Sequence, residues 1–164
     1  MKLEELIEKF SDTSENQTKA IFNTIFIIAN KLQTIFDQQI PEITLKQFML
    51  LSMVHQANEP QSLTQLGELL GCSRQNVKKL ALSLEQKGFI AFKTNTADSR
   101  ATMIVPTDKV TDFFDHDFAC YLQDLHYLFA VYTKEEIEQL FKLLMRLYQG
   151  VDYLNQKTNK GSVK

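Results

Sequence analysis

The sequence predicts a mainly α-helical protein that contains one small β-hairpin. Apolar residues recur at intervals of three and four along several long stretches, which is the period of an amphipathic helix. Glycine residues and capping residues such as Ser and Thr divide these stretches. The period changes between Phe89 and Val105, where two short runs of β-prone residues flank a polar segment.

Length and composition limit the class of protein. The 164 residues carry 18 Lys and Arg against 20 Asp and Glu, a formal net charge of −2. This length predicts one domain, or one domain with a helical annex, that can bury a core without disulfides. Two cysteines make no disulfide framework, the first ten residues are too acidic for a secretory signal, and the apolar run Ile25–Ala29 is too short for a membrane span. We therefore expect a cytoplasmic protein that makes no use of a membrane.

Helical segments are predicted on both sides of a central lobe. Residues 1–40 and residues 108–154 hold the flanking helices, and residues 41–107 form the lobe. The last flanking helix opens with the capping box Thr133–Glu136. Residues 155–164 are polar and are expected to fray.

The first long flanking helix is expected to start at a cap supplied by Asp12 or Ser14 and to end before Pro41. A second long helix begins at Thr107, and its apolar face extends to Leu125. Both helices are amphipathic, with a wide apolar face.

Capping signals place short helices at the start of the lobe. Thr44 opens the first of them. Ser62 and Gln65 have the spacing of a capping box and open the second, which Gly71 terminates.

A further helix and a hairpin complete the lobe. Ser73 caps the helix Arg74–Lys87, and Gly88 ends it. Phe89–Lys93 and Ala101–Val105 then read as the two strands of a hairpin with a polar tip.

This order of elements is that of a winged helix-turn-helix lobe, in which the second short helix reaches base edges in the DNA major groove. Removing the apolar stripe of that helix leaves cations and amides in its first two turns, and these suit guanine, adenine and phosphate groups. The candidates are Arg74, Gln75, Asn76, Lys78 and Lys79. Ser62, Thr64 and Ser73, at the starts of the two short helices, are candidates for contacts with the DNA backbone.

The charge distribution favours the same surface. Between Ser62 and Pro106 six Lys and Arg residues accompany three Asp and Glu residues, a net charge of +3, so the rest of the chain carries −5. A basic segment on an acidic protein is typical of a focused phosphate-binding face. The alternative is an ordinary solvated helix face, and the hairpin in the expected place favours DNA binding over it.

Residues Ile43–Thr107 resemble the DNA-binding region of the MarR-type multiple-antibiotic-resistance regulators. The resemblance rests on ITLKQFMLL, SLTQLGELLG, CSRQNVKKLALSLEQKGFI and the wing segment Asp98–Arg100. It implies that Arg100 reaches the minor groove or its phosphates, with Asp98 orienting it. Lys93, in the strand that leads into the wing, is a further candidate contact. The resemblance also implies a homodimer built from the terminal helices, with a small-molecule pocket between the dimer and DNA-binding regions.

The apolar surface indicates a homodimer independently. Ile21–Phe36, Val110–Leu125 and Ile137–Tyr148 present more apolar surface than a small lobe can cover. Helices that cannot bury such faces alone usually meet a second copy through two-fold symmetry. Two recognition helices about 34–36 Å apart would then read a palindromic site on double-stranded DNA. A monomer with a tightly folded helical annex is the alternative.

A small apolar or aromatic effector is the other predicted partner. Side chains such as Phe26, Met49 and Phe113 could line a pocket for it, although a stripe at helical spacing more often packs the core. A ligand that changes the spacing of the two lobes would release the DNA, so we expect a repressor.

Cys72 precedes the cap of the Arg74–Lys87 helix, where the positive helix end and Arg74 would favour a reactive thiol. We favour the alternative, in which Cys72 is a small apolar residue that fills the turn. Cys120, between apolar neighbours, is predicted to pack in the same way.

Metal binding and catalysis have weaker support. Asp112, Asp115, His116 and His126 could share one helix face and hold zinc or manganese, but no second cluster completes a site. The sequence has no phosphate-binding glycine loop, nucleophile elbow or paired-histidine motif. We expect neither an enzyme nor a bound cofactor.

A winged-helix module that binds another protein is the alternative function. The modest charge of the wing and the isoelectric point of about 5.9 are the features that favour it.

Overall fold

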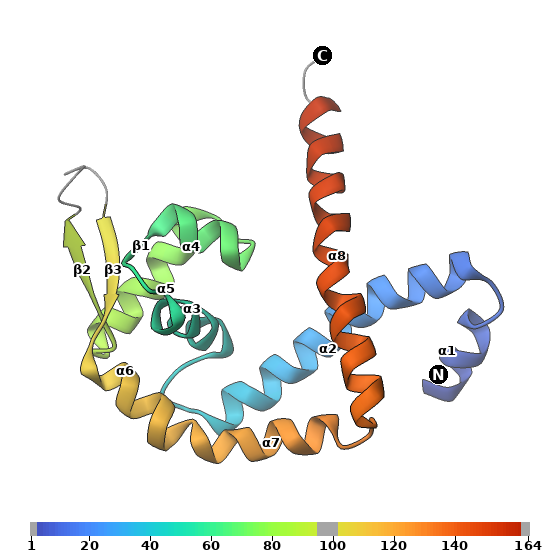
Figure 1. The fold of residues 1–164 in the computed structure, drawn as a ribbon, viewed down its shortest axis with the longest axis horizontal. Coiled ribbons are helices and arrows are strands. Elements are labelled where there is room, and N and C mark those ends of the chain that lie inside the picture. Colours follow the sequence, from blue (N-terminus) through green and yellow to red (C-terminus); the bar gives the residue numbers. More distant parts are fainter. Residues whose placement is uncertain (1–2, 95–101, 162–164) are drawn as a thin grey trace. The chain divides into compact units, whose positions relative to one another are not determined.

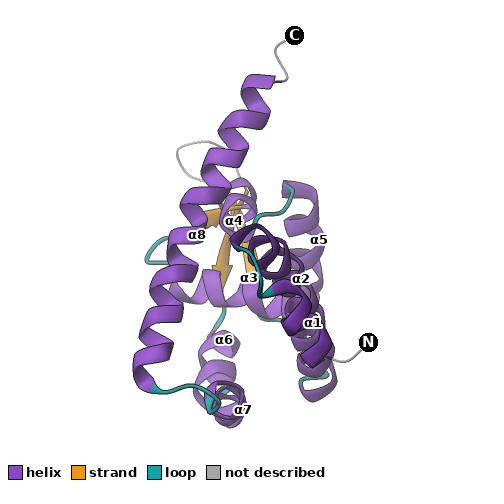
Figure 2. Cartoon of the chain, turned by 90° about the vertical axis from the view of Figure 1, so that its right-hand side faces the viewer, coloured by secondary structure: helices purple, strands orange, loops and turns teal. Residues whose placement is uncertain are grey.

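The computed structural model describes residues 3–94 and 102–161. The chain divides into two compact units, residues 1–111 and residues 112–164. Helices make up most of the chain, and the strands occupy one small region (Figure 2). The predicted fold class, mainly helical with a small antiparallel sheet, is confirmed.

The first unit opens with three helices: α1 (Leu3–Phe10), α2 (Ser14–Gln39) and α3 (Leu45–Gln56). Thr13 caps α2, because its hydroxyl oxygen accepts a hydrogen bond from the backbone N–H of Asn16 at 3.2 Å. The prediction of Asp12 or Ser14 as the cap is therefore wrong. Thr13 has the extended backbone that a cap requires, whereas Ser14 is already the first residue of the helix.

The start of α3 confirms the predicted cap at Thr44. The Thr44 hydroxyl accepts from the backbone N–H of Gln47 at 3.3 Å, and the Gln47 side chain accepts from the N–H of Thr44 at 3.1 Å. A carboxylate oxygen of Asp37, in the last turns of α2, accepts from the N–H of Leu45 at 2.6 Å. The end of α2 is thus joined directly to the beginning of α3.

The lobe continues with a helix pair and a three-stranded sheet: β1 (Gln61–Ser62), α4 (Leu63–Leu70), α5 (Arg74–Gln86), β2 (Ile90–Thr94) and β3 (Thr102–Pro106). The strand order is β1-β3-β2, and both pairings are antiparallel. The predicted hairpin is present as β2 and β3. β1 was not predicted, because two residues are too few to show a period. Figure 1 shows α3, α4 and α5 gathered beside this sheet.

The core of the lobe lies where these three helices meet the sheet. Its side chains are buried almost completely, and they include Leu50, Leu51, Leu66, Val77, Leu84, Phe89 and Ile104. Burying one such side chain contributes about 1.5–3 kcal/mol to folding. Because α5 turns its apolar stripe toward this core, its opposite face must point to solvent.

Four helical elements follow the sheet: α6 (Asp108–Asp112), η1 (Phe113–Asp117), α7 (Ala119–Phe129) and α8 (Lys134–Gly161). The predicted single helix from Thr107 is therefore interrupted by η1, which is a π-helix. The N–H of Phe118 donates to the carbonyl of Phe113, five residues earlier, at 2.7 Å. The rings of Phe113, Phe114 and Phe118 lie within 5.4–6.3 Å of one another at this turn. An apolar period cannot distinguish such a wider turn from an α-helical one.

The predicted capping box at the start of α8 is confirmed. The N–H of Thr133 donates to the Glu136 carboxylate at 2.8 Å, and the N–H of Glu136 donates to the Thr133 hydroxyl at 3.2 Å. The prediction of a frayed tail from Asn155 is wrong as far as Gly161, since α8 continues to that residue. Extending a helix requires much less free energy than starting one, and Gln and Lys favour helices.

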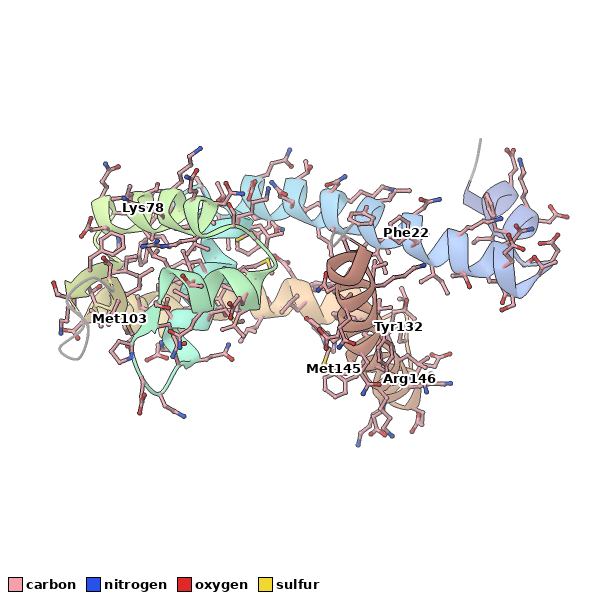
Figure 3. All side chains as sticks on the ribbon, turned by 90° about the horizontal axis from the view of Figure 1, so that it is seen from above. Phe22, Lys78, Met103, Tyr132, Met145 and Arg146 are labelled. Atoms are coloured by element: carbon pink, nitrogen blue, oxygen red, sulfur yellow. The ribbon has the colours of Figure 1, made fainter. Side chains whose placement is uncertain are left out.

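The flanking helices carry many large apolar side chains that are exposed. Figure 3 labels Phe22 on α2 and Met145 on α8, which are 61% and 44% exposed. Others on α2 are Ile21, Ile25, Phe26, Ile27, Ile28 and Ile35, and others on α8 are Phe141, Leu143, Leu144, Leu147 and Tyr148. Among the helices described within residues 3–94 and 102–161, none has the length and hydropathy to span a membrane.

Candidate nucleic-acid interface

The outer face of α5 is the most distinctive polar surface of the lobe. Val77, Ala81 and Leu84 on the inner face are fully buried. The side chains of the first two turns on the other face are all exposed: Arg74, Gln75, Asn76, Lys78 and Lys79. The structure therefore brings the five predicted candidates together on one helix surface, and Figure 3 labels Lys78 among them.

The turn between α4 and α5 fixes how these two helices approach each other. Gly71 has φ 64°, a left-handed backbone conformation that terminates α4. The N–H of Cys72 donates to the carbonyl of Gly67 at 2.9 Å. A Cβ atom on Gly67 would lie 2.7 Å from the carbonyl oxygen of Cys72, so the turn can pack this closely only because Gly67 has no side chain.

Ser73 caps α5, and its hydroxyl accepts from the backbone N–H of Asn76 at 3.3 Å. Ser62 caps α4 with a complete capping box: its hydroxyl accepts from the N–H of Gln65 at 3.2 Å, and its own N–H donates to the Gln65 side chain at 2.9 Å. Thr64, in the first turn of α4, is exposed. The predicted caps are confirmed, while contacts of these three residues with DNA stay a prediction.

The wing candidates are only partly described. Lys93 lies on β2 opposite Met103 of β3, and its side chain is exposed. Asp98 and Arg100 lie outside the described residues, so their predicted roles stay predictions.

A pocket of about 530 Å³ adjoins the polar face of α5. It is lined by Lys46 and Met49 of α3, by Leu70 at the end of α4, by Gly71 and Cys72 of the turn, and by Asn76, Lys79 and Leu80 of α5. Lys46 was missed by the sequence analysis, since its place beside α5 depends on the packing of α3 against that helix. Its only signal in the sequence is a cation two residues after the helix cap.

Cys72 is half-buried and lines this pocket, and its sulfur forms no disulfide. The candidate metal ligands are not assembled into a site: among the residues that the structure describes, no group of three His, Cys, Asp or Glu side chains could hold a metal ion. The ring Nδ1 of His116 instead lies 3.2 Å from the backbone carbonyl of Asp112.

Taken with the helix pair and its glycine turn, the three-stranded sheet defines a winged helix-turn-helix lobe. Comparison with known proteins agrees. Residues 43–102 match the model of the MarR family, so the chain contains a MarR-family domain, and the resemblance seen in the sequence is confirmed.

Solved structures show the same fold over most of the chain. One is a MarR/EmrR family transcriptional regulator from Acinetobacter sp. ADP1, which is 23% identical with a TM-score of 0.71, over 83% of this chain and 97% of that one. Another is MepR from S. aureus in complex with DNA, at 18% identity and a TM-score of 0.69, over 79% of this chain and 96% of that one. A third is a MarR family transcriptional regulator from Streptomyces coelicolor in complex with DNA, at 17% identity and a TM-score of 0.73, over 84% of this chain and 89% of that one.

Proposed function

We propose that this protein is a cytoplasmic transcriptional regulator that binds double-stranded DNA through the outer face of α5. The observation that carries the proposal is the cluster of five exposed polar side chains in the first two turns of a helix whose other face is buried. Two of the solved structures with this fold are DNA complexes, which supports the same role. A role in binding, not catalysis, accords with the family match.

The side chains on this face differ in the DNA groups that they suit. Arg74, Lys78 and Lys79 suit the acceptors of guanine and the phosphates, whereas Gln75 and Asn76 suit adenine. A helix that enters the major groove presents its N-terminal turns to base edges, and these are the turns that carry the five side chains.

Contacts at the edge of this face would position the protein on the duplex. Ser62, Thr64 and Ser73 stand at helix N-termini, where hydroxyl and backbone N–H groups suit phosphate oxygens. Lys93 adds a cation at the base of the wing. We assign Arg100 to the minor groove or its phosphates, oriented by Asp98, from the family resemblance alone.

We further propose a homodimer that reads a palindromic operator and represses transcription. The exposed apolar side chains of α2 and α8 form surfaces of the kind that proteins bury against partners. A two-fold axis would place two copies of α5 about one turn of DNA apart.

A small apolar or aromatic effector would release the DNA. The pocket beside α5 supports this part of the proposal, because Met49, Leu70 and Leu80 give it apolar walls. Its lining includes Asn76 and Lys79. A bound effector would therefore lie next to two side chains to which we assign DNA contacts.

Fluorescence anisotropy tests the DNA-binding role. The protein is titrated onto a duplex from upstream of its own gene and onto a scrambled duplex, at two salt concentrations. We expect tighter binding to the native duplex and a steep salt dependence. Lys78→Ala and Lys79→Ala should each lower the slope of log K against log salt by about 0.9 per lost phosphate contact.

Lys157→Ala is the matched control, since Lys157 is an exposed lysine of α8 outside the lobe, and it should leave both affinity and slope unchanged. Weak binding that is equal on both duplexes would contradict the proposal. It would favour the alternative in which the lobe binds another protein.

A further inference from the structure

We propose that five residues from different parts of the chain meet at the C-terminal end of α5 and form a clamp. This clamp sets the direction in which the helix presents its polar face. The clamp consists of Glu42, Gln47, Ser83, Lys87 and Lys109. The inference rests on the proposed function, because it takes α5 as the recognition helix. It assigns positioning roles to residues at the opposite end of the helix from the proposed DNA contacts.

Gln47 is the centre of the clamp. Its polar side chain lies in the core of the lobe and is only 6% exposed. The capping box at the start of α3 uses one hydrogen bond of its carbonyl oxygen. The side chain makes two more bonds, and both reach the end of α5: Nε2 donates to the Ser83 hydroxyl at 2.8 Å, and Oε1 accepts from Lys87 Nζ at 3.1 Å.

Two lysines extend the clamp on either side of the α5 terminus. Lys87, the residue that ends α5, also donates from Nζ to the backbone carbonyl of Glu42 at 2.5 Å. Lys109 of α6 donates to the carbonyl of Lys87 at 3.1 Å and to the Glu42 carboxylate at 2.6 Å. Its Nζ lies 4.2 Å from the centre of the Phe89 ring, which adds a cation–π contact. The end of α5 is therefore held from α3 and from α6.

Directional bonds at this end matter because the apolar contacts along α5 are not directional. α5 has 13 residues, so it is about 20 Å long. A tilt of about 10° at its C-terminal end would move its first turn by about 3 Å. Hydrogen bonds to base edges tolerate only a few tenths of an ångström in donor–acceptor distance. Loss of the clamp should therefore impair base reading more than attraction to phosphates.

DNA binding of three variants separates positioning from direct contact. Gln47→Met and Lys87→Met should each weaken binding to the native duplex about tenfold, which is the effect of losing one well-aligned contact with a base edge. They should leave binding to the scrambled duplex, and the salt slope, unchanged. Lys78→Met, the same change in the proposed DNA face, should instead reduce the salt slope on both duplexes.

A conservative variant tests the mechanism of the clamp. Gln47→Glu keeps the oxygen atoms that accept from Thr44 and Lys87, and the Ser83 hydroxyl can reverse and donate to it. We expect it to retain the preference for the native duplex. Equal losses on both duplexes, a smaller salt slope for Lys87→Met, or an unchanged preference in Gln47→Met would each overturn the proposal.

A measurement without DNA keeps the clamp and the proposed function distinguishable. Amide hydrogen exchange at Lys87, Gly88 and Phe89 should accelerate about tenfold in Gln47→Met. If it does not, the clamp is wrong whether or not the protein binds DNA. If the wild type binds no DNA but this exchange accelerates, only the proposed function fails.

Lys109→Met is a second test of the clamp, for use if Gln47→Met does not fold. The Lys109–Glu42 ion pair is 43% and 44% exposed, so its loss should leave the protein folded. It should still weaken native-duplex binding several-fold while sparing the scrambled duplex. Unchanged binding to both duplexes would count against the clamp.

Discussion

At the scale of single residues, one glycine sets the geometry of the helix pair because it has no side chain. Gly67 is buried in α4, and a Cβ atom there would collide with the backbone of the following turn. The backbone oxygen of Cys72 cannot rotate away as the tip of a long side chain can. Close packing of α4 against the start of α5 therefore depends on this glycine.

Gly67→Ala should lower the free energy of unfolding by about 1–3 kcal/mol, because the backbone has to shift to relieve the overpacked contact. Thermal and urea unfolding measure the loss. Gly150→Ala is the control: Gly150 lies within α8, and its added Cβ would meet only a Leu147 methyl group at an ordinary 3.9 Å. That change should stabilise the protein by about 0.5–1 kcal/mol. A stabilising Gly67→Ala would contradict the packing described here.

Asp12 is a second residue whose surroundings make a measurable prediction. The Asn16 side chain donates to its carboxylate at 2.9 Å and, with the N–H of Thr13, lowers the pKa of Asp12 below its ordinary value. A carboxyl group with a lowered folded-state pKa stabilises the fold above its unfolded pKa. That contribution is lost as the pH falls through the folded pKa.

Asn16→Ala should raise the pKa of Asp12 toward its ordinary value, as followed by NMR titration of the carboxyl carbon. Asn30→Ala, farther along the same helix, should leave that pKa where it is. If Asn16→Ala left the pKa unchanged, the hydrogen bond would not be its cause.

At the scale of elements, the caps of four helices could be predicted from the sequence, whereas the cap of α2 was predicted wrongly. Caps depend on two residues three positions apart, so Thr44, Ser62, Ser73 and Thr133 could be identified from the sequence alone. The same local rule could not show that Gln47 also reaches α5, because that contact joins residues 36 positions apart.

The π-helix η1 was beyond prediction for a different reason. Phe113, Phe114 and Phe118 satisfy an apolar period in either kind of turn. What distinguishes the two is a single hydrogen bond to the fifth residue instead of the fourth. β1 was missed because a strand of two residues is defined by its partner, β3, and not by its own sequence.

Deleting His116, an exposed residue of η1, should convert the π-turn into a regular α-helical turn. Removing one residue would rotate the following helices by about 100° about the helix axis. We expect a folded protein that loses at least tenfold in affinity for the native duplex. His116→Ala keeps the chain length and should bind DNA normally. Full DNA binding after the deletion would show that the extra residue has no role in function.

At the scale of the whole molecule, the exposed apolar side chains of α2 and α8 are the surfaces that we propose a second copy covers. Light scattering of the purified protein should give twice the 19.0 kDa of one chain. Phe22→Glu and Phe141→Glu, each at a site 61% exposed in the single chain, should shift the mass toward that of the monomer. Leu69→Glu, on α4 and 63% exposed, should not. A monomeric wild type would contradict the proposed dimer.

The central strand of the sheet, β3, has its register fixed from both edges. β3 is paired on both sides, with Gln61 opposite Ile104 on one edge and Phe92 opposite the same residue on the other. A slip by one position would turn the buried Ile104 outward. Pairing on both edges therefore holds β3 in one register and keeps Ile104 in the core. Because β1 leads into α4 and α5 leads into β2, this one strand ties together the outer ends of the helix pair, so a change that loosens β3 would loosen both helices at once.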